Sequence, residues 1–133
     1  MIHSLKSGEY LRSIYPKNNI PITNVRICPK FGYIVMFLEK DQSLFLYSIN
    51  GDLLHKNFVT NKIQSMIISD DEEYLITGAS DSVLQLFHLH SLTSIDNLVL
   101  DCGISSLAFS SFGQFLFVGL QNGDLLVGVF LTN

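Results

Sequence analysis

The sequence predicts an all-β fold made of repeated four-stranded sheets, and three observations support this prediction. Short apolar runs rich in branched and aromatic residues recur along the chain, separated by small, acidic or glycine-containing segments that favour turns. The pattern of residues 63–100 is repeated on both sides of that segment. With 47% hydrophobic and 15% charged residues among 133, the chain can also bury a core.

The segment 63–100 contains four apolar runs separated by polar breaks, as expected for an antiparallel meander. The runs are rich in Ile, Val, Leu, Tyr and Phe, the residue types enriched in strands. The four expected strands cover residues 66–68, 74–77, 83–87 and 98–100. The breaks cover 69–73, 78–82 and 91–94. The segment is therefore predicted to form one complete sheet.

The same pattern returns at a spacing of 41 residues, which takes Ile63 forward to Ile104 and back to Ile22. Further pairs at this spacing are Met66 with Leu107, Tyr74 with Phe115, Gly78 with Gly119, and Leu84 with Leu125. One extra residue between positions 37 and 43 shortens the backward offset, so that Leu44 pairs with Leu84. Four strands in about 40 to 45 residues are typical of WD-type propeller blades. The sequence therefore predicts a partial WD40-like β-propeller.

We expect a single partial propeller domain over residues 1–133, with about three blades. Residues 1–21 are assigned to the end of a preceding blade and a linker, and the blades to 22–62, 63–103 and 104–133, the last lacking its fourth strand. Closed propellers need roughly four to eight blades, so the chain is expected to belong to a larger protein. Alone it is expected to aggregate, because both ends expose apolar blade faces. A monodisperse, cooperatively melting monomer would contradict this expectation.

The composition argues against several classes of function. The net charge of −4, with only eight Lys and Arg, does not suit binding to nucleic acid, which needs clustered cations. The apolar runs have strand length, so no transmembrane segment is expected. Cys28 and Cys102 occupy different points of the repeat and are interpreted as reduced thiols.

No set of residues predicts a catalytic, cofactor or metal site. His88 and His90, two apart on an expected strand, could share a face and a metal, but no third ligand is evident, and residues 70–73 suit a solvated turn better than a calcium loop. Ser105 and Ser106 lack a Gly-x-Ser-x-Gly context. The phenylalanines near the C-terminus are expected in the core between blades rather than on a stacking surface: Phe109, Phe112, Phe115 and Phe117.

Four passages together resemble the C-terminal propeller of the BEACH-domain proteins, the neurobeachin and LPS-responsive beige-like anchor group. They are IHSLKSGEYLRSIYP at 2–16, LFLYSINGDLL at 44–54, ITGASDSVLQLFHLHSL at 76–92 and FLFVGLQNGDLLVGV at 115–129. Where standard WD repeats carry Trp-Asp, this chain has Tyr47-Ser48 and Phe87-His88. Blade cohesion is therefore expected to depend on apolar packing more than on the usual polar network.

The resemblance implies a non-catalytic protein-interaction scaffold in vesicle trafficking and protein localisation. It implies a cytoplasmic protein, with peripheral endomembrane association expected only for the full-length chain, and protein partners bound through propeller loops and rims. The exposed loops expected from the sequence are 16–21, 39–42, 70–73 and 80–82.

Two alternatives remain open at this stage. One is a WD40 scaffold of another pathway, such as a ubiquitin-ligase adaptor or coat subunit. The other is a propeller hydrolase, which needs carboxylates at first-strand positions. This chain has apolar residues there: Val25, Ile27, Met66, Ile68, Leu107 and Phe109.

Overall fold

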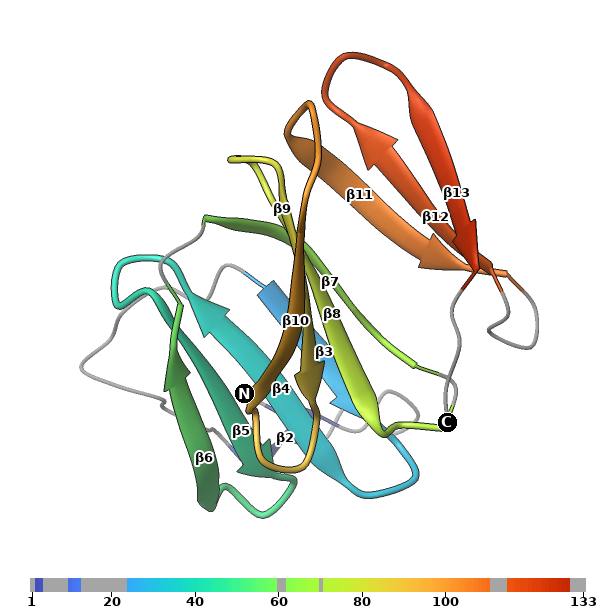
Figure 1. The fold of residues 1–133 in the computed structure, drawn as a ribbon. Coiled ribbons are helices and arrows are strands. Elements are labelled where there is room, and N and C mark those ends of the chain that lie inside the picture. Colours follow the sequence, from blue (N-terminus) through green and yellow to red (C-terminus); the bar gives the residue numbers. More distant parts are fainter. Residues whose placement is uncertain are drawn as a thin grey trace.

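The computed structural model describes residues 2–3, 10–12, 24–59, 62–69, 71–110 and 115–129, and in this part of the chain it is all β. Three antiparallel sheets follow one another along the sequence, and each takes its strands in chain order. Figure 1 shows the sheets fanned side by side. The predicted fold class is confirmed.

Each sheet is named by its order. The first sheet contains β3 (Asn24–Cys28), β4 (Tyr33–Leu38), β5 (Ser43–Ser48) and β6 (Leu53–Phe58). The second contains β7 (Ile63–Ile68), β8 (Tyr74–Ala79), β9 (Val83–His88) and β10 (Ser94–Val99). The third contains β11 (Ile104–Phe109), β12 (Phe115–Leu120) and β13 (Leu125–Val129). Before them, β1 (Ile2–His3) pairs with β2 (Tyr10–Arg12).

Three expected boundaries in the second sheet were wrong by two residues or more. Strand β7 begins at Ile63 instead of Met66. Strand β8 continues through Gly78 and Ala79, which the sequence placed in a turn, because Gly78 still pairs with Leu84 on β9. A Cβ on Gly78 would lie 2.5 Å from Ile104 Cγ2, so this glycine lets the third sheet approach closely. Strand β10 begins at Ser94 instead of Leu98. Its polar first half pairs with β9 by backbone hydrogen bonds, which apolar patterning does not report.

The first strands of neighbouring sheets lie next to each other, β3 beside β7 and β7 beside β11 (Figure 1). The repeat also extends to the backbone hydrogen bonds. The Ser69 N–H donates to the Tyr74 carbonyl at 2.9 Å, and the Ser110 N–H donates to the Phe115 carbonyl at 2.9 Å. Residues 41 apart in sequence therefore occupy equivalent places in successive sheets.

The core lies between the sheets. Alternate side chains of each middle strand point to opposite neighbours, so β4 and β8 are buried on both faces and read as continuous apolar runs. The junction between the first and second sheets is filled by a cluster that includes Val35, Phe37, Leu44, Leu46, Met66, Leu75, Phe87, Leu89 and Leu92. The junction between the second and third sheets buries Ile76, Ile104, Leu107, Leu116, Val118 and Leu120.

The hairpins between the second and third strands of each sheet share one backbone feature. Gln42, Ser82 and Gly123 each have a positive φ, of 49°, 74° and 93°. Each donates its N–H to the carbonyl three residues earlier, at 3.1, 3.2 and 3.1 Å. Glycine suits this conformation, and it occupies the position in the third sheet alone among these three.

Candidate functional site

The predicted loops lie at both ends of the sheets. Because consecutive turns of a meander alternate between its ends, the turns 39–42 and 80–82 share one rim, and the turn after β7 lies on the opposite rim. Residues 16–21 and Asp70 lie outside the described residues. The described loops expose Lys40, Gln42 and Asp81 on the first rim.

Two ion pairs lie beside the turn 39–42, and the lysine of each is exposed. The Lys62 Nζ lies 3.2 Å from Glu39 Oε1, and the Lys56 Nζ lies 3.4 Å from Asp41 Oδ2. The Lys62 and Lys56 side chains are 60% and 43% exposed, so these pairs contribute little to stability. They leave this rim with mixed charge that a partner can contact.

The acidic turn between β7 and β8 is not a uniformly solvated segment, as the sequence suggested. Glu72 is only 5% exposed, and its Oε1 and Oε2 accept the Lys30 N–H at 3.1 and 3.2 Å. The turn itself is held by Asp71, whose Oδ1 accepts the Ser69 hydroxyl at 2.6 Å and the Glu73 N–H at 3.1 Å. Glu72 thus links the second sheet to the first, and Asp71 and Glu73 remain exposed. A carboxylate can be buried here because a backbone donor compensates it.

Cys28 lies at this link. It is fully buried, and burial, followed by the negative charge of Glu72, raises the pKa of its thiol to about 12. The thiolate is the reactive form, so Cys28 is chemically inert in the folded chain. Neither Cys28 nor Cys102 forms a disulfide in the structure.

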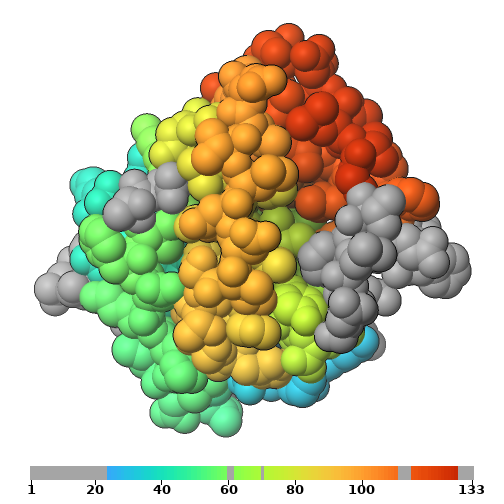
Figure 2. All heavy atoms as spheres, in the orientation of Figure 1, coloured from blue at the N-terminus to red at the C-terminus, as the bar shows by residue number. Residues whose placement is uncertain are grey.

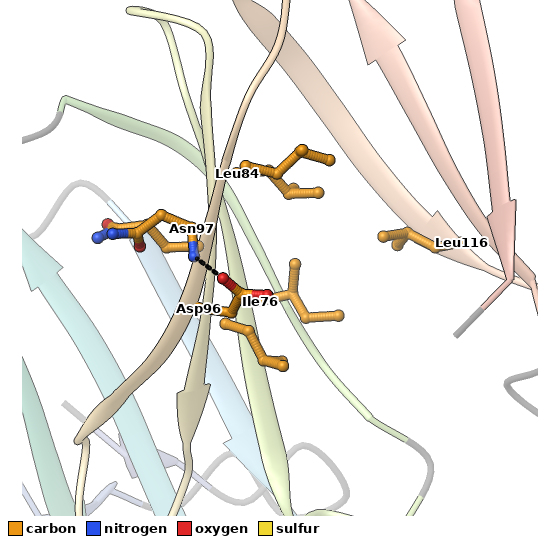
Figure 3. Close-up of a pocket in the computed structure, with 8 residues that line it drawn as sticks. Ile76, Leu84, Asp96, Asn97 and Leu116 are labelled. Atoms are coloured by element: carbon orange, nitrogen blue, oxygen red, sulfur yellow. Dashed lines mark hydrogen bonds between the residues drawn. The ribbon is translucent and has the colours of Figure 1, made fainter. Parts of the chain in front are cut away.

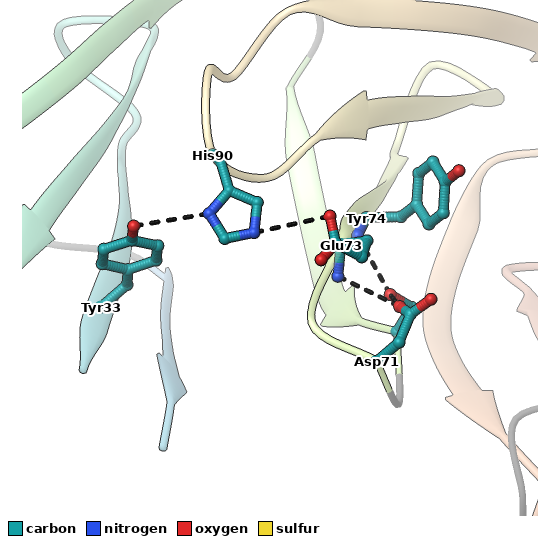
Figure 4. Close-up of polar contacts among 6 residues, drawn as sticks. Tyr33, Asp71, Glu73, Tyr74 and His90 are labelled. Carbon is teal, nitrogen blue, oxygen red and sulfur yellow. Dashed lines mark hydrogen bonds and ion pairs between the residues drawn. The ribbon is translucent and has the colours of Figure 1, made fainter. Parts of the chain in front are cut away.

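The two histidines do not share a strand face. His88 ends β9 and stacks on Tyr74 at 5.8 Å, whereas His90 lies in the turn that follows. The His90 Nδ1 is 3.4 Å from the Tyr33 hydroxyl and its Nε2 is 3.6 Å from Glu73 Oε2 (Figure 4). His90 therefore bridges the rims of the first two sheets. Among the described residues, no group of three His, Cys, Asp or Glu is arranged to hold a metal ion.

The other candidates have structural surroundings. The Ser105 hydroxyl donates to the Gly119 carbonyl at 3.1 Å. Phe109 packs against the core of the second junction, but Phe115 is 42% exposed, so the expectation of a core position was wrong for Phe115. Phe112 lies outside the described residues. In the part of the chain that the structure describes, no helix is long and apolar enough to cross a membrane.

An apolar cleft between the second and third sheets was not predicted from the sequence (Figure 3). Two adjoining cavities, of about 180 and 370 Å³, open there. Their lining side chains are mainly leucines: Leu84, Leu86, Leu98, Leu100, Leu116 and Leu126. Asp96 lies at the cleft on β10, and its Oδ1 accepts the Asn97 N–H at 2.8 Å. In the space-filling view, β10 forms a ridge beside the third sheet (Figure 2).

Solved structures of WD40 repeats share this fold. The structure titled "Crystal structure of RRP9 WD40 repeats" matches with a TM-score of 0.76 and 20% identity, over 86% of this chain and 37% of that one. The structure titled "Structure of U3-55K" matches with a TM-score of 0.77 and 19% identity, over 86% and 38%. The computationally designed Ika4 protein matches with a TM-score of 0.68 and 14% identity, over 83% and 66%. The chain is therefore a partial WD40-type β-propeller.

The family is shown by sequence. Residues 1–131 match the family model described as the neurobeachin beta propeller domain, and the chain belongs to this family. BEACH domain-containing protein B of Arabidopsis thaliana is 27% identical over 129 residues, which cover 96% of this chain. The chain spans about 5% of the length of that relative.

Proposed function

We propose that this chain is the C-terminal propeller segment of a BEACH-type protein and serves as a non-catalytic scaffold that binds other proteins in vesicle trafficking and protein localisation. The family match over residues 1–131 is the observation that carries the proposal. The name of the Arabidopsis relative points to the same class of protein.

The proposed mechanism is the presentation of loops on a rigid support. The first junction buries Phe37, Phe87 and Leu46 almost completely, so the turns at both ends of its sheets are held in place. A preorganised loop loses little conformational freedom when a partner binds. The proposed contact residues are those exposed on the rims, among them Lys40, Asp81, Asp71 and Glu73.

The proposal also covers the partners, the cofactor requirement and the cellular location of the protein. Its partners are proteins and not nucleic acid, because the chain carries a net charge of −4. It needs no cofactor, and it acts in the cytoplasm, with peripheral endomembrane association supplied by other parts of the full-length protein. The blades are assigned to residues 22–62, 63–103 and 104–133, consistent with sheets that begin at β3, β7 and β11.

Proximity labelling in cells tests the proposal with the full-length protein. Two variants reverse exposed charged side chains on one rim each: the double variant Lys40→Glu with Asp81→Lys on the first rim, and the single variant Glu73→Lys on the opposite rim. We expect at least one of them to lose a defined set of labelled neighbours and to shift in endomembrane colocalisation at unchanged abundance. His55→Gln is the control, because His55 is exposed and pairs with Leu46 in the middle of the edge strand β6, between the two rims.

The result that contradicts the proposal is equally direct. If deletion of the whole propeller segment leaves both the labelled neighbours and the localisation unchanged, the segment is not an interaction scaffold. If the neighbours that depend on the rims are ubiquitin-ligase or coat subunits, the scaffold works in another pathway.

A further inference from the structure

The second junction differs from the first at equivalent positions of the repeat. In the second sheet, Phe87 on β9 pairs with Leu75 on β8. The residues 41 positions later are Gly128 on β13 and Leu116 on β12, and they pair with each other in the third sheet. Phe87 is 1% exposed and fills the first junction. A Cβ placed on Gly128 would meet no atom within 4 Å. The second junction therefore lacks one aromatic side chain that the first contains.

A second difference removes a polar link. Asn57 pairs with Leu44 on the outer strand of the first sheet, and its Nδ2 donates to the Leu92 carbonyl across the junction at 2.6 Å. The equivalent residue is Leu98, which pairs with Leu84 and is 55% exposed. The outer part of the second junction thus has neither the hydrogen bond nor the close packing of the first.

The inner part of the same junction is closed. Phe37 of the first sheet corresponds to Gly78 of the second. Phe37 pairs with Leu44 on the third strand of its sheet, and Gly78 pairs with the equivalent residue, Leu84. Here the missing side chain is replaced by Ile104, whose Cγ2 would be 2.5 Å from a Cβ on Gly78. Only the outer half of the junction stays open, and it forms the cleft of Figure 3.

A fourth strand on the third sheet would not fill this cleft. On the equivalent strand of the second sheet, β10, Val99 lies on the face opposite to that of Leu98, and it is still 71% exposed. An outer strand would pair with the other edge of β13 and would add no side chain at Gly128 itself. The position opposite Leu116 would remain without a side chain in a completed sheet.

We propose that the cleft binds a peptide segment of a partner protein, which inserts one aromatic side chain beside Gly128 and sets an adjacent Lys or Arg on Asp96. This inference rests on the proposed scaffold function and names one surface that performs it. The aromatic side chain takes the place that Phe87 occupies in the first junction, against an apolar lining that includes Leu84 and Leu98. The carboxylate of Asp96 and the net charge of −4 favour a basic neighbour.

A photocrosslinking experiment on the full-length protein that contains this propeller segment tests the proposal. The probe is the peptide acetyl-Gly-Xaa-Lys-Gly-amide, with Xaa a benzoylphenylalanine, and crosslinks are mapped by mass spectrometry. We expect crosslinks in β9, β10, β12 and β13, displaced by the same peptide with Phe and at least tenfold less effectively by the peptide with Ala. Replacing the lysine of the competitor with glutamate is expected to weaken displacement several-fold, and this effect is expected to vanish in Asp96→Asn.

Gly128→Leu is the decisive variant. Its side chain has room, and Gly128 has no positive φ that a side chain would strain, so the fold is expected to persist while the cleft is filled and crosslinking falls at least tenfold. Val99→Phe adds the same number of carbon atoms, four, on the opposite face of β10 and is expected to change nothing. Leu98→Asp is a second variant. It places a negative charge in the apolar lining of the cleft, at a site that is already 55% exposed, and it is also expected to reduce crosslinking.

Several results would overturn the proposal. Crosslinks spread over the rims, or labelling that persists in both Gly128→Leu and Leu98→Asp, would show that the cleft is not the site. Labelling of the cleft that appears only in Phe130→Ala would mean that the chain's own C-terminal residues occupy it. None of these results bears on the rim variants in cells. The cleft proposal can therefore be refuted while the proposed scaffold function is still supported.

Discussion

Truncation of Phe87 to alanine tests whether the first junction holds two sheets together. Phe87 is 1% exposed and packs in one cluster with Leu75, Leu89 and Leu92. A buried phenylalanine removes about 150 to 250 Å² from water, and at about 25 cal/mol per Å² this corresponds to about 4 to 6 kcal/mol. Alanine retains part of this area but leaves a cavity, so we expect the free energy of unfolding to fall by about 3 to 5 kcal/mol.

Urea unfolding followed by tyrosine fluorescence measures the effect, since the chain has five tyrosines and no tryptophan. Phe115→Ala is the matched control, because Phe115 is 42% exposed and should lose at most about half as much. Amide exchange should also accelerate in both β5 and β9, which contribute to the cluster from different sheets. Equal losses for Phe87→Ala and Phe115→Ala would refute the view that sheet-to-sheet packing stabilises this fold.

Three further predictions concern single residues. Burial raises the pKa of Cys28 from about 9 to about 12, so its contribution to stability is complete below pH 9 and should be lost at about 1.4 kcal/mol per pH unit as the pH rises between those values. Because burial also raises the pKa of Tyr47, Cys28→Ala should make the slope in pH-dependent urea titrations shallower without abolishing it. Ser82→Gly should raise the free energy of unfolding by about 0.5 to 1 kcal/mol because the φ of Ser82 is 74°, whereas Ser80→Gly, at ordinary φ, should lower it. Asn57→Ala should cost about 1 to 2 kcal/mol in the same assay, because the Leu92 carbonyl loses its donor, and an unchanged midpoint would mean that water replaces the amide.

Much of the fold follows from the order of residues alone. The spacing of 41 residues predicts where sheets recur, because each sheet must bury its apolar faces against a copy of itself. The runs at β4 and β8 identify the middle strands, since a strand covered on both faces has no polar alternation. The polar first half of β10 cannot be predicted as a strand from its apolar pattern, because it is held by backbone pairing with β9.

The surfaces depend on contacts between distant residues. The sequence places Glu72 in a run of acids, and only the approach of the Lys30 N–H explains why its carboxylate is buried while Glu73 is exposed. His90 likewise acquires its neighbours from the first sheet, 57 residues away in the case of Tyr33. No local pattern contains this information, because it depends on how one sheet is seated on the next.

The sequence by itself determined the class of fold, the length of the repeat and the family resemblance, since all three are properties of residue order. The tertiary structure decided which equivalent positions are filled. Gly128 stands where the repeat has Phe87, and Gly78 where it has Phe37, yet only one of these gaps is open. The difference arises because Ile104 packs into the space at Gly78 and no neighbour reaches the space at Gly128, which only packed coordinates can show.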